Sequence, residues 1–207
     1  MDKFTVLEST AAPLLRQNIN TDVIIRVERL RDFPKGELGP YAFESWRYDL
    51  DGKENPDFVL NKEAYRDAQI MLAADNFACG SSREMAVWAL MDFGIRCVIA
   101  PSFGQIFFNN CFQNGLLPVV APLEEIERMA AEVEQSQGAG RITVDLEKCE
   151  VVSPSGKKIS FALDEIRRDA LLKGLDAIEQ TMQWDAEIAA FQAADRKRFP
   201  WIYESAP

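Results

Sequence analysis

Strands alternating with helices in the middle of the chain limit the possible fold more than any other sequence feature. Three short apolar runs read as buried strands: IMLA at 70–73, CVIAPS at 97–102 and LLPVVAP at 116–122. The segments between them, 82–93 and 103–114, have helical patterns, and each is followed by a glycine of the kind that ends helices. This alternation predicts an α/β domain built in layers.

The flanking segments complete the expected architecture. Residues 123–135 predict an acidic amphipathic helix, and 141–163 alternate around SPSG, which is typical of a hairpin. The run Val23 to Val27 predicts a strand, and the part from about 164 to 207 is helical. We therefore expect residues 1–207 to form a single three-layer β/β/α domain with mixed sheet and a C-terminal helical extension. The irregular segment 31–56 is long enough to suggest a functional loop.

The chain contains no histidine. A Ser-His-Asp or Cys-His triad and a histidine zinc site are therefore excluded. Any general base in this chain must be a carboxylate, lysine, tyrosine, cysteine or activated serine, or must come from a partner.

Charge and cysteine usage narrow the class of protein further. A net charge of −10 argues against a nucleic-acid or anionic-membrane partner, because both require a basic face. The start lacks the apolar run of a signal peptide and no segment has the length of a membrane span, so we expect a cytoplasmic protein. The cysteines are scattered, and we expect reduced structural thiols without metal: Cys79, Cys97, Cys111 and Cys149.

The stretch NFACGSSREMA, residues 76–86, has the composition of an anion site. It lies between a strand and a helix, where unsatisfied backbone N–H groups and the helix dipole favour a negative ligand. Gly80 opens the backbone to a ligand, Ser81 and Ser82 supply hydroxyls, and Arg83 can hold a carboxylate by two hydrogen bonds. An alkoxide beside Arg83 could act as a base.

The same residues also allow a purely structural interpretation. Gly-Ser-Ser before a helix is a common capping arrangement, with Ser81 or Ser82 as the N-cap and Glu84 as a cap or a partner of Arg83. Thr21 and Asp22 likewise fit an ordinary Asx or N-cap turn. The phosphate-binding Walker loop is absent, since no G-x-x-x-x-G-K occurs.

Several motifs together resemble one known family. NFACGSSRE, GIRCVIAPSFGQIFFNNCFQNGLLPV, NINTDVII, GPYAFESWRY, NPDFVLN and KGLDAIEQTMQ are similar to the small subunits of bacterial 3-isopropylmalate dehydratases, which are swivelling domains of the aconitase superfamily. The resemblance runs from Val6 to Gln192 in the same order.

The resemblance implies a hydro-lyase that is active only with a second, large subunit. That subunit would carry a [4Fe–4S] cluster and the acid–base histidines, so this chain would bind no cofactor itself. The two chains would isomerise 2-isopropylmalate to 3-isopropylmalate in leucine biosynthesis, through dehydration and rehydration. Ser81 would be the catalytic base and would act on a small dicarboxylate. The implied substrate-binding residues are Ser82, Arg83, Thr21, Asp22, Arg26, Arg29 and Arg31.

Three positions depart from the family pattern. Met85 replaces the usual histidine after GSSRE, Arg26 replaces a proline, and Arg29 replaces an aromatic residue in the triplet that shapes the substrate pocket. An unpaired guanidinium in an apolar pocket is costly. Arg26 or Arg29 therefore points to solvent, pairs with an acid such as Glu28 or Asp32, or meets an extra carboxylate on a different substrate.

Two alternatives to the isopropylmalate reaction remain open at this point. The chain could belong to a hydratase for another 2-hydroxy diacid, or be a paralogue that binds without catalysis. A stand-alone serine hydrolase is excluded, because the chain has neither a histidine nor a plausible lysine partner near Ser81.

Overall fold

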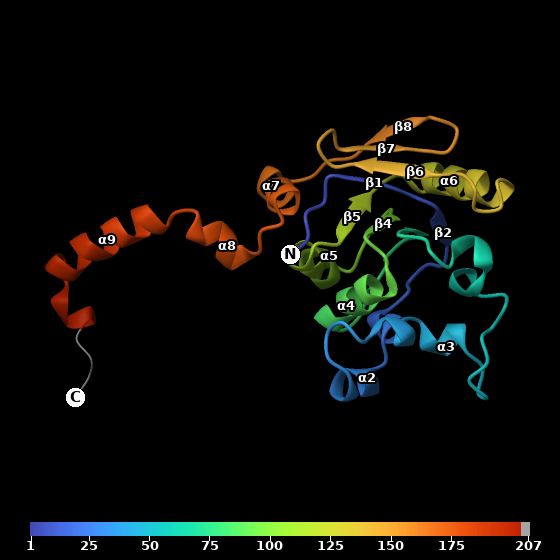
Figure 1. The fold of residues 1–207 in the computed structure, drawn as a ribbon, viewed down its shortest axis with the longest axis horizontal. Helices are drawn as coiled ribbons and strands as arrows, with labels where there is room; N and C mark the ends of the chain where they lie inside the picture. The colour runs from blue at the N-terminus through green and yellow to red at the C-terminus, as the bar shows by residue number, and fades with distance from the viewer. Residues whose placement is uncertain (204–207) are drawn as a thin grey trace. The chain divides into compact units, whose positions relative to one another are not determined.

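The computed structural model describes residues 1–203, which divide into two compact units at Gly174. The first unit, residues 1–174, contains every strand and the hydrophobic core (Figure 1). The second begins at Leu175 and is helical. No helix in the described part of the chain has the length and apolar character needed to cross a membrane.

A four-stranded parallel sheet forms the centre of the first unit. Its strands lie in the order β2 (Ala11–Leu14), β3 (Ile70–Ala73), β4 (Cys97–Ala100) and β5 (Leu117–Val120). β3 and β4 are buried along their whole length, as expected for parallel strands covered on both faces. The three strands predicted in this region are confirmed.

Helices α4 (Glu84–Phe93) and α5 (Gln105–Asn114) connect β3 to β4 and β4 to β5. Both end at a left-handed glycine, Gly94 and Gly115, as predicted. Figure 1 shows them on one side of the parallel sheet. The predicted acidic helix is α6 (Leu123–Gln135), which packs against β2, β3 and β4.

The second sheet is antiparallel. It has the order β1 (Val6–Ser9), β6 (Ile142–Asp145), β7 (Glu150–Val152) and β8 (Lys158–Ser160). The predicted hairpin is confirmed, since β7 and β8 are joined by a turn over residues 153–157. The three-layer α/β fold is thus confirmed, with parallel and antiparallel pairing in separate sheets.

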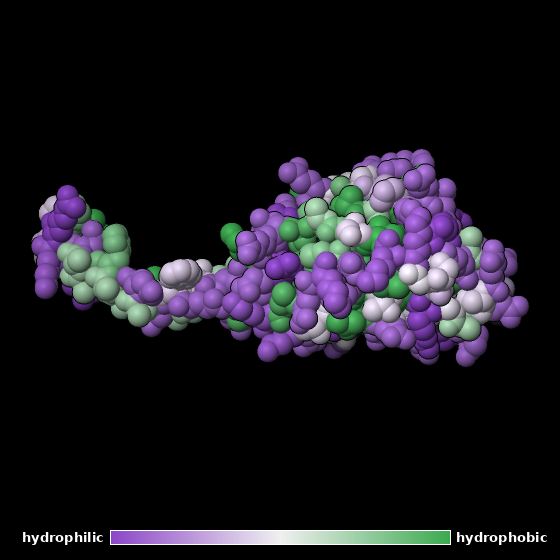
Figure 2. All heavy atoms as spheres, turned by 90° about the horizontal axis from the view of Figure 1, so that it is seen from above, coloured by the Kyte–Doolittle hydropathy of each residue, from purple (hydrophilic) through white to green (hydrophobic). Residues whose placement is uncertain are grey.

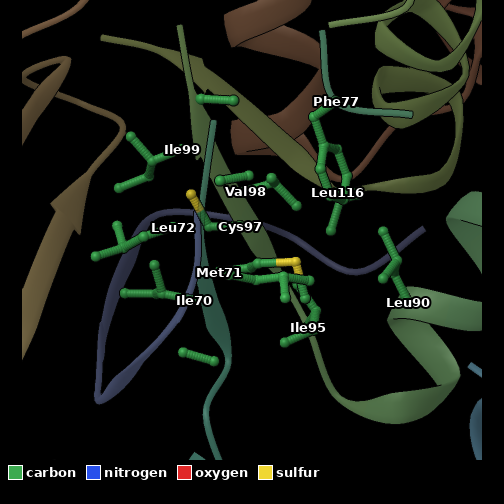
Figure 3. Close-up of a cluster of buried hydrophobic side chains, with 14 of the residues drawn as sticks. Ile70, Met71, Leu72, Phe77, Leu90, Ile95, Cys97, Val98, Ile99 and Leu116 are labelled. Atoms are coloured by element: carbon green, nitrogen blue, oxygen red, sulfur yellow. The ribbon is translucent and has the colours of Figure 1, made fainter. Parts of the chain in front are cut away.

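The core packs on both faces of the parallel sheet and includes buried side chains of α4, α5 and α6. Side chains of β3 and β4 gather with residues from α4 and the connecting loops (Figure 3). Ten of them are labelled there: Ile70, Met71, Leu72, Phe77, Leu90, Ile95, Cys97, Val98, Ile99 and Leu116. All ten are fully buried. Burial raises the pKa of the Cys97 thiol, which therefore behaves as an apolar core group.

The prediction of a strand from Val23 to Val27 is wrong. These residues belong to two short helices, α1 (Thr21–Ile24) and α2 (Val27–Asp32). The side chain of Asn20 accepts a hydrogen bond of 2.9 Å from the backbone N–H of Val23 and so starts a helical turn. This cap outweighs the β-propensity of the isoleucines that follow, which are buried by tertiary packing instead.

The segment after α2 consists of short helices and loops: η1 (Gly39–Tyr41), α3 (Glu44–Arg47), η2 (Val59–Asn61) and η3 (Glu63–Tyr65). The buried guanidinium of Arg47 holds it together. Arg47 donates to Asn61 Oδ1 at 3.1 Å and to the carbonyl of Pro40 at 3.2 Å. Its guanidinium also lies over the ring of Phe93 of α4, 4.7 Å from the centroid.

The C-terminal part is helical, as predicted. It contains α7 (Glu165–Lys173) in the first unit, followed by α8 (Ala177–Met182), α9 (Asp185–Arg198) and η4 (Pro200–Ile202) in the second. Asp164 caps α7 by accepting from the N–H groups of its first turn.

An ion-pair network connects the β7–β8 turn to α6, and it predicts that the stability of the fold falls in acid. Lys157 and Arg128 both donate to Glu125, and these hydrogen bonds hold the pKa of Glu125 below its ordinary value of 4.5. A depressed pKa contributes stability above the unfolded value, which is lost as pH falls through the folded pKa. Wild type should therefore be more stable than Glu125→Gln at pH 6, and the gap should close below about pH 4.5.

Urea unfolding between pH 3 and 7 measures this gap. Glu127→Gln is a suitable control, because Glu127 is exposed on the same helix and has no ion pair among residues 1–203. A difference between wild type and Glu125→Gln that stays constant over this range would contradict the prediction.

Candidate functional site

The loop from β3 to α4 carries the predicted serine–arginine motif in an unusual backbone conformation. Asn76 and Ala78 have φ of +57° and +55°, and Gly80 has φ of +95°. Left-handed non-glycine residues persist only where surrounding contacts impose them. Phe77 supplies such contacts: its ring is fully buried, and its N–H donates to the carbonyl of Ser102 at 3.0 Å.

A second segment, residues 19–21, fixes the other side of this loop. The N–H of Cys79 donates to the carbonyl of Ile19 at 3.2 Å, and the N–H of Thr21 donates to the carbonyl of Cys79 at 2.9 Å. The hydroxyl of Thr21 donates to the carbonyl of Ser81 at 3.0 Å. Thr21 is buried, so the structure places it behind the loop, where it holds the Ser81 backbone.

Ser81 is exposed at the edge of a hollow of about 270 Å³. The lining comes from the loop and from the start of α5: Asn76, Ala78, Cys79, Gly80, Ser81, Gly104, Gln105, Ile106 and Phe107. No side chain caps α5, whose N-cap is Gly104. The first N–H groups of α5 therefore have no partner within the helix, and the residues that carry them line the same hollow as Ser81.

This arrangement corrects the expected helix. Sequence reasoning predicted α4 as the donor helix with Ser81 or Ser82 as its N-cap, but α4 begins at Glu84 with Arg83 at the N-cap and no side-chain cap. The extra residues belong to the strained loop, which Phe77 and Thr21 pull away from helical geometry.

Arg83 is largely buried beside the loop and is already paired. Its Nη1 forms an ion pair with Asp22 and donates to the carbonyl of Ile25 at 3.4 Å. Asp22 is half exposed. The predicted residues Ser81, Ser82, Arg83, Thr21 and Asp22 are thus brought together by the contact between α1 and the loop.

Arg26 and Arg29 meet at Glu44 of α3. Arg29 Nε donates to Glu44 Oε2 at 2.9 Å, and Arg26 Nε lies 3.4 Å from Glu44 Oε1 and 3.5 Å from Glu28 Oε2. Arg29 also lies over the ring of Tyr41, 4.5 Å from the centroid. Of the alternatives open for these arginines, pairing with an acid is the one found in the structure.

These groups border a second hollow of about 630 Å³. Glu44 was not among the residues singled out from the sequence. Its only signal there was that it is a carboxylate among the aromatic residues of segment 31–56. Arg31 has a different partner from Arg26 and Arg29. It is exposed and donates to Asp32 at 2.9 Å, and this hydrogen bond raises the pKa of the guanidinium.

Glu84 has a different partner from the two predicted. Its Oε1 accepts from Asn114 Nδ2 at 2.8 Å, and Asn114 Oδ1 accepts from Trp88 Nε1 at 2.8 Å and from Lys35 Nζ at 2.9 Å. This buried amide connects the first residue of α4 to the last turn of α5. Glu84 therefore fixes the two helices against each other.

The cysteines do not fit an iron–sulfur ligand set. All four are free thiols, and Cys97 and Cys111 are fully buried in the core, where burial raises their pKa. Only Cys79 lines the hollow beside Ser81. Within residues 1–203, no three His, Cys, Asp or Glu side chains converge on a possible metal position.

Comparison with known proteins assigns the fold and then the family. The model of the aconitase C-terminal domain matches residues 1–124, and a model described as LeuD_N matches residues 127–165. The crystal structure of 3-isopropylmalate dehydratase LeuD from Methanocaldococcus jannaschii superimposes with a TM-score of 0.63, at 24% identity over 89% of this chain and 98% of that chain. The fold and the serine–arginine loop therefore define an aconitase-type swivel domain.

Curated relatives name the family within this class. The 3-isopropylmalate dehydratase small subunit of Parvibaculum lavamentivorans is 51% identical over 98% of this chain and 100% of its own length. That of Gluconobacter oxydans is 54% identical over 93% of this chain and 92% of its own. The chain belongs to the 3-isopropylmalate dehydratase small-subunit family. None of these relatives supports another diacid or a non-catalytic paralogue.

Proposed function

We propose that this chain is the small subunit of a cytoplasmic hydro-lyase that isomerises 2-isopropylmalate to 3-isopropylmalate in leucine biosynthesis. The observation that carries the proposal is the position of Ser81, exposed beside the first N–H groups of α5 and held there by Thr21. Identity near 50% with small subunits over almost the full length supports the substrate.

In this proposal Ser81 is the base that removes the proton bound to the substrate carbon. A serine hydroxyl has no histidine to activate it in this chain, so its alkoxide must be stabilised by neighbouring donors. The hollow offers the N–H groups at the start of α5 for this purpose. Loss of the proton and of the adjacent hydroxyl gives an unsaturated diacid, and addition of water in the other orientation gives the isomer.

Arg83 and Ser82 are proposed to bind a substrate carboxylate. The pair with Asp22 uses Nη1 of Arg83, and the planar guanidinium retains other donors for a two-bond contact. Asp22 would orient Arg83, and Thr21 would position Ser81, which makes both of them supporting residues of the binding loop.

The paired arginines are proposed to border the substrate's side group. Glu44 pairs with Arg29 and Arg26, Glu28 also pairs with Arg26, and the ring of Tyr41 covers one face of Arg29. A paired and stacked guanidinium can flank an apolar group at far lower cost than an unpaired one. The replacement of the family's aromatic residue is thereby compatible with isopropylmalate. Arg31 is the most peripheral of the proposed binding residues because its side chain points to solvent.

The partner is proposed to be a large subunit with a [4Fe–4S] cluster. When bound there, such a cluster would supply Lewis-acid chemistry at the substrate hydroxyl. This chain would supply the base and the carboxylate-binding loop, and the partner would supply the metal.

Anaerobic assays with the cluster-loaded large subunit of the same organism test the proposal. We expect kcat/KM for 2-isopropylmalate to be at least tenfold higher than kcat/KM for the hydration of citraconate, dimethylmaleate or aconitate. Turnover of another diacid alone would contradict the proposed substrate. No turnover of any of the four compounds, with the cluster intact, would contradict the proposed catalytic role. Each subunit assayed alone serves as the control and should be inactive.

A further inference from the structure

Glu44 is the most deeply buried charged side chain at the hollow that Arg26 and Arg29 border. Its side chain is 10% exposed, against 52% for Arg26 and 35% for Arg29. Its Oε1 is buried and accepts no hydrogen bond within residues 1–203. A buried carboxylate oxygen without a donor costs stability, so a carboxylate at this position calls for a role beyond the stability of α3.

The backbone fixes Glu44 beside the arginines. Phe43, the residue before it, is fully buried, has φ of +53° and donates its N–H to the carbonyl of Ile24 at 2.8 Å. A left-handed phenylalanine persists only where its surroundings impose that conformation. α3 therefore begins against the end of α1, and its first residue, Glu44, is held next to Arg26, the N-cap of α2.

The arginine pair is connected to the proposed carboxylate-binding group. Arg83 Nη1 donates to the carbonyl of Ile25 at 3.4 Å, and Arg26 is the next residue along the chain. The peptide bond between Ile25 and Arg26 thus joins the guanidinium proposed to bind the substrate to the hollow proposed to take its side group.

Positive charge stands out at this hollow. Hydrophilic residues cover most of the first unit's surface in the view of Figure 2, and in the whole chain 33 acidic residues outnumber 23 basic ones. Two guanidinium groups at one hollow would attract a further carboxylate, which arginine binds by charge-assisted hydrogen bonds. Glu44 removes part of that attraction, because Nε of Arg29 lies 2.9 Å and Nε of Arg26 lies 3.4 Å from its oxygens.

We propose that Glu44 is a specificity-determining residue that prevents Arg26 and Arg29 from binding a carboxylate on the side group of the substrate. The inference rests on the proposed function and defines its substrate class: dicarboxylates with an apolar side group are accepted, and tricarboxylates are rejected. The negative charge of Glu44 repels a further carboxylate, and donors that already face Glu44 are not offered to it. An apolar side group meets neither penalty.

The test uses two substrates that differ in the side group. Isopropylmaleate, the unsaturated diacid of the proposed reaction, carries an isopropyl group where cis-aconitate carries a carboxymethyl group. Hydration of each is measured anaerobically with the full-length chain assembled with the cluster-loaded large subunit of the same organism. The ratio of the two kcat/KM values, taken on one preparation, does not depend on the fraction of active enzyme.

Glu44→Gln removes the charge and keeps the size of the side chain. We expect it to raise the ratio of kcat/KM for cis-aconitate to kcat/KM for isopropylmaleate at least tenfold. Glu28→Gln is the matched control: Glu28 also pairs with Arg26, at 3.5 Å, but it is 58% exposed, where pairing is weak, so the ratio should stay within twofold. Adding Arg29→Gln to Glu44→Gln should return the ratio to within threefold of wild type, because the gain depends on a free guanidinium.

The outcomes separate this inference from the proposed function. An unchanged ratio in Glu44→Gln, or a gain that survives the loss of Arg29, would overturn the specificity role while wild-type turnover of isopropylmaleate leaves the proposed function intact. Wild type that hydrates neither compound, or that prefers cis-aconitate, would overturn both. If Glu44→Gln gives no active heteromer, Glu44→Asp provides the same test, because its shorter carboxylate cannot approach both arginines as closely. The ratio should then rise at least threefold, and an unchanged ratio would overturn the proposal.

Discussion

The Ser81→Ala variant, assembled with its large subunit, is expected to lose about 10³-fold in kcat, in the range that proton-transfer groups contribute. Its KM should change little, since the hydroxyl acts on the proton and the carboxylate contacts belong to Arg83 and Ser82. Folding should be unaffected, because the side chain is exposed and the loop is held through the Ser81 carbonyl by Thr21. Steady-state kinetics under anaerobic conditions measure both parameters.

Two further measurements make this result specific to the serine base. The Kd for the large subunit should remain that of wild type, which excludes loss of assembly as the cause. Ser160→Ala, an exposed serine of β8, is the matched control and should retain full activity. If Ser81→Ala turned over substrate within tenfold of wild type, another group would have to be the base.

The fold was predictable where local pattern and tertiary packing agree. The buried runs at β3, β4 and β5 are apolar throughout, and Gly94 and Gly115 end the intervening helices in left-handed geometry. The prediction failed at Val23 to Val27, where one side-chain cap from Asn20 decides between strand and helix. Apolar composition alone cannot register such a cap, because isoleucines are buried equally well in either conformation.

The residues of the serine–arginine motif could be predicted from the sequence, but the helix that supplies the backbone N–H donors could not. The serine–arginine motif stands out by composition, and the structure brings it together with Thr21 and Asp22. The helix whose first turn lines the same hollow as Ser81 is α5, which follows the motif by more than twenty residues. Glu44 is likewise distant in sequence from the arginines it pairs. Both relations arise from tertiary packing, so short-range patterns contain no signal for them.

Gly104→Ala is expected to produce the largest combined effect on stability and activity. A Cβ at this position would lie 2.3 Å from the carbonyl oxygen of Ala78 and 3.0 Å from the Cα of Cys79. Both are backbone atoms of the serine loop, so no side-chain rotation can relieve the overlap. Such overpacking costs about 1–3 kcal/mol of unfolding free energy. Because the loop must move, Ser81 shifts relative to α5, and a displacement near 1 Å can cost about 10²-fold in rate.

The matched control separates this contact from the general effect of adding a methyl group. Gly156, in the β7–β8 turn, has φ of +85°, and no atom lies within 4 Å of the place that an added methyl carbon would take, so Gly156→Ala introduces backbone strain without a clash. It should cost about 1 kcal/mol of stability and leave kcat unchanged. Urea unfolding and steady-state kinetics of both variants then report stability and rate. Normal kcat in Gly104→Ala would mean that the close approach of α5 to the loop does not position Ser81, and would remove the α5 donors from the proposed site.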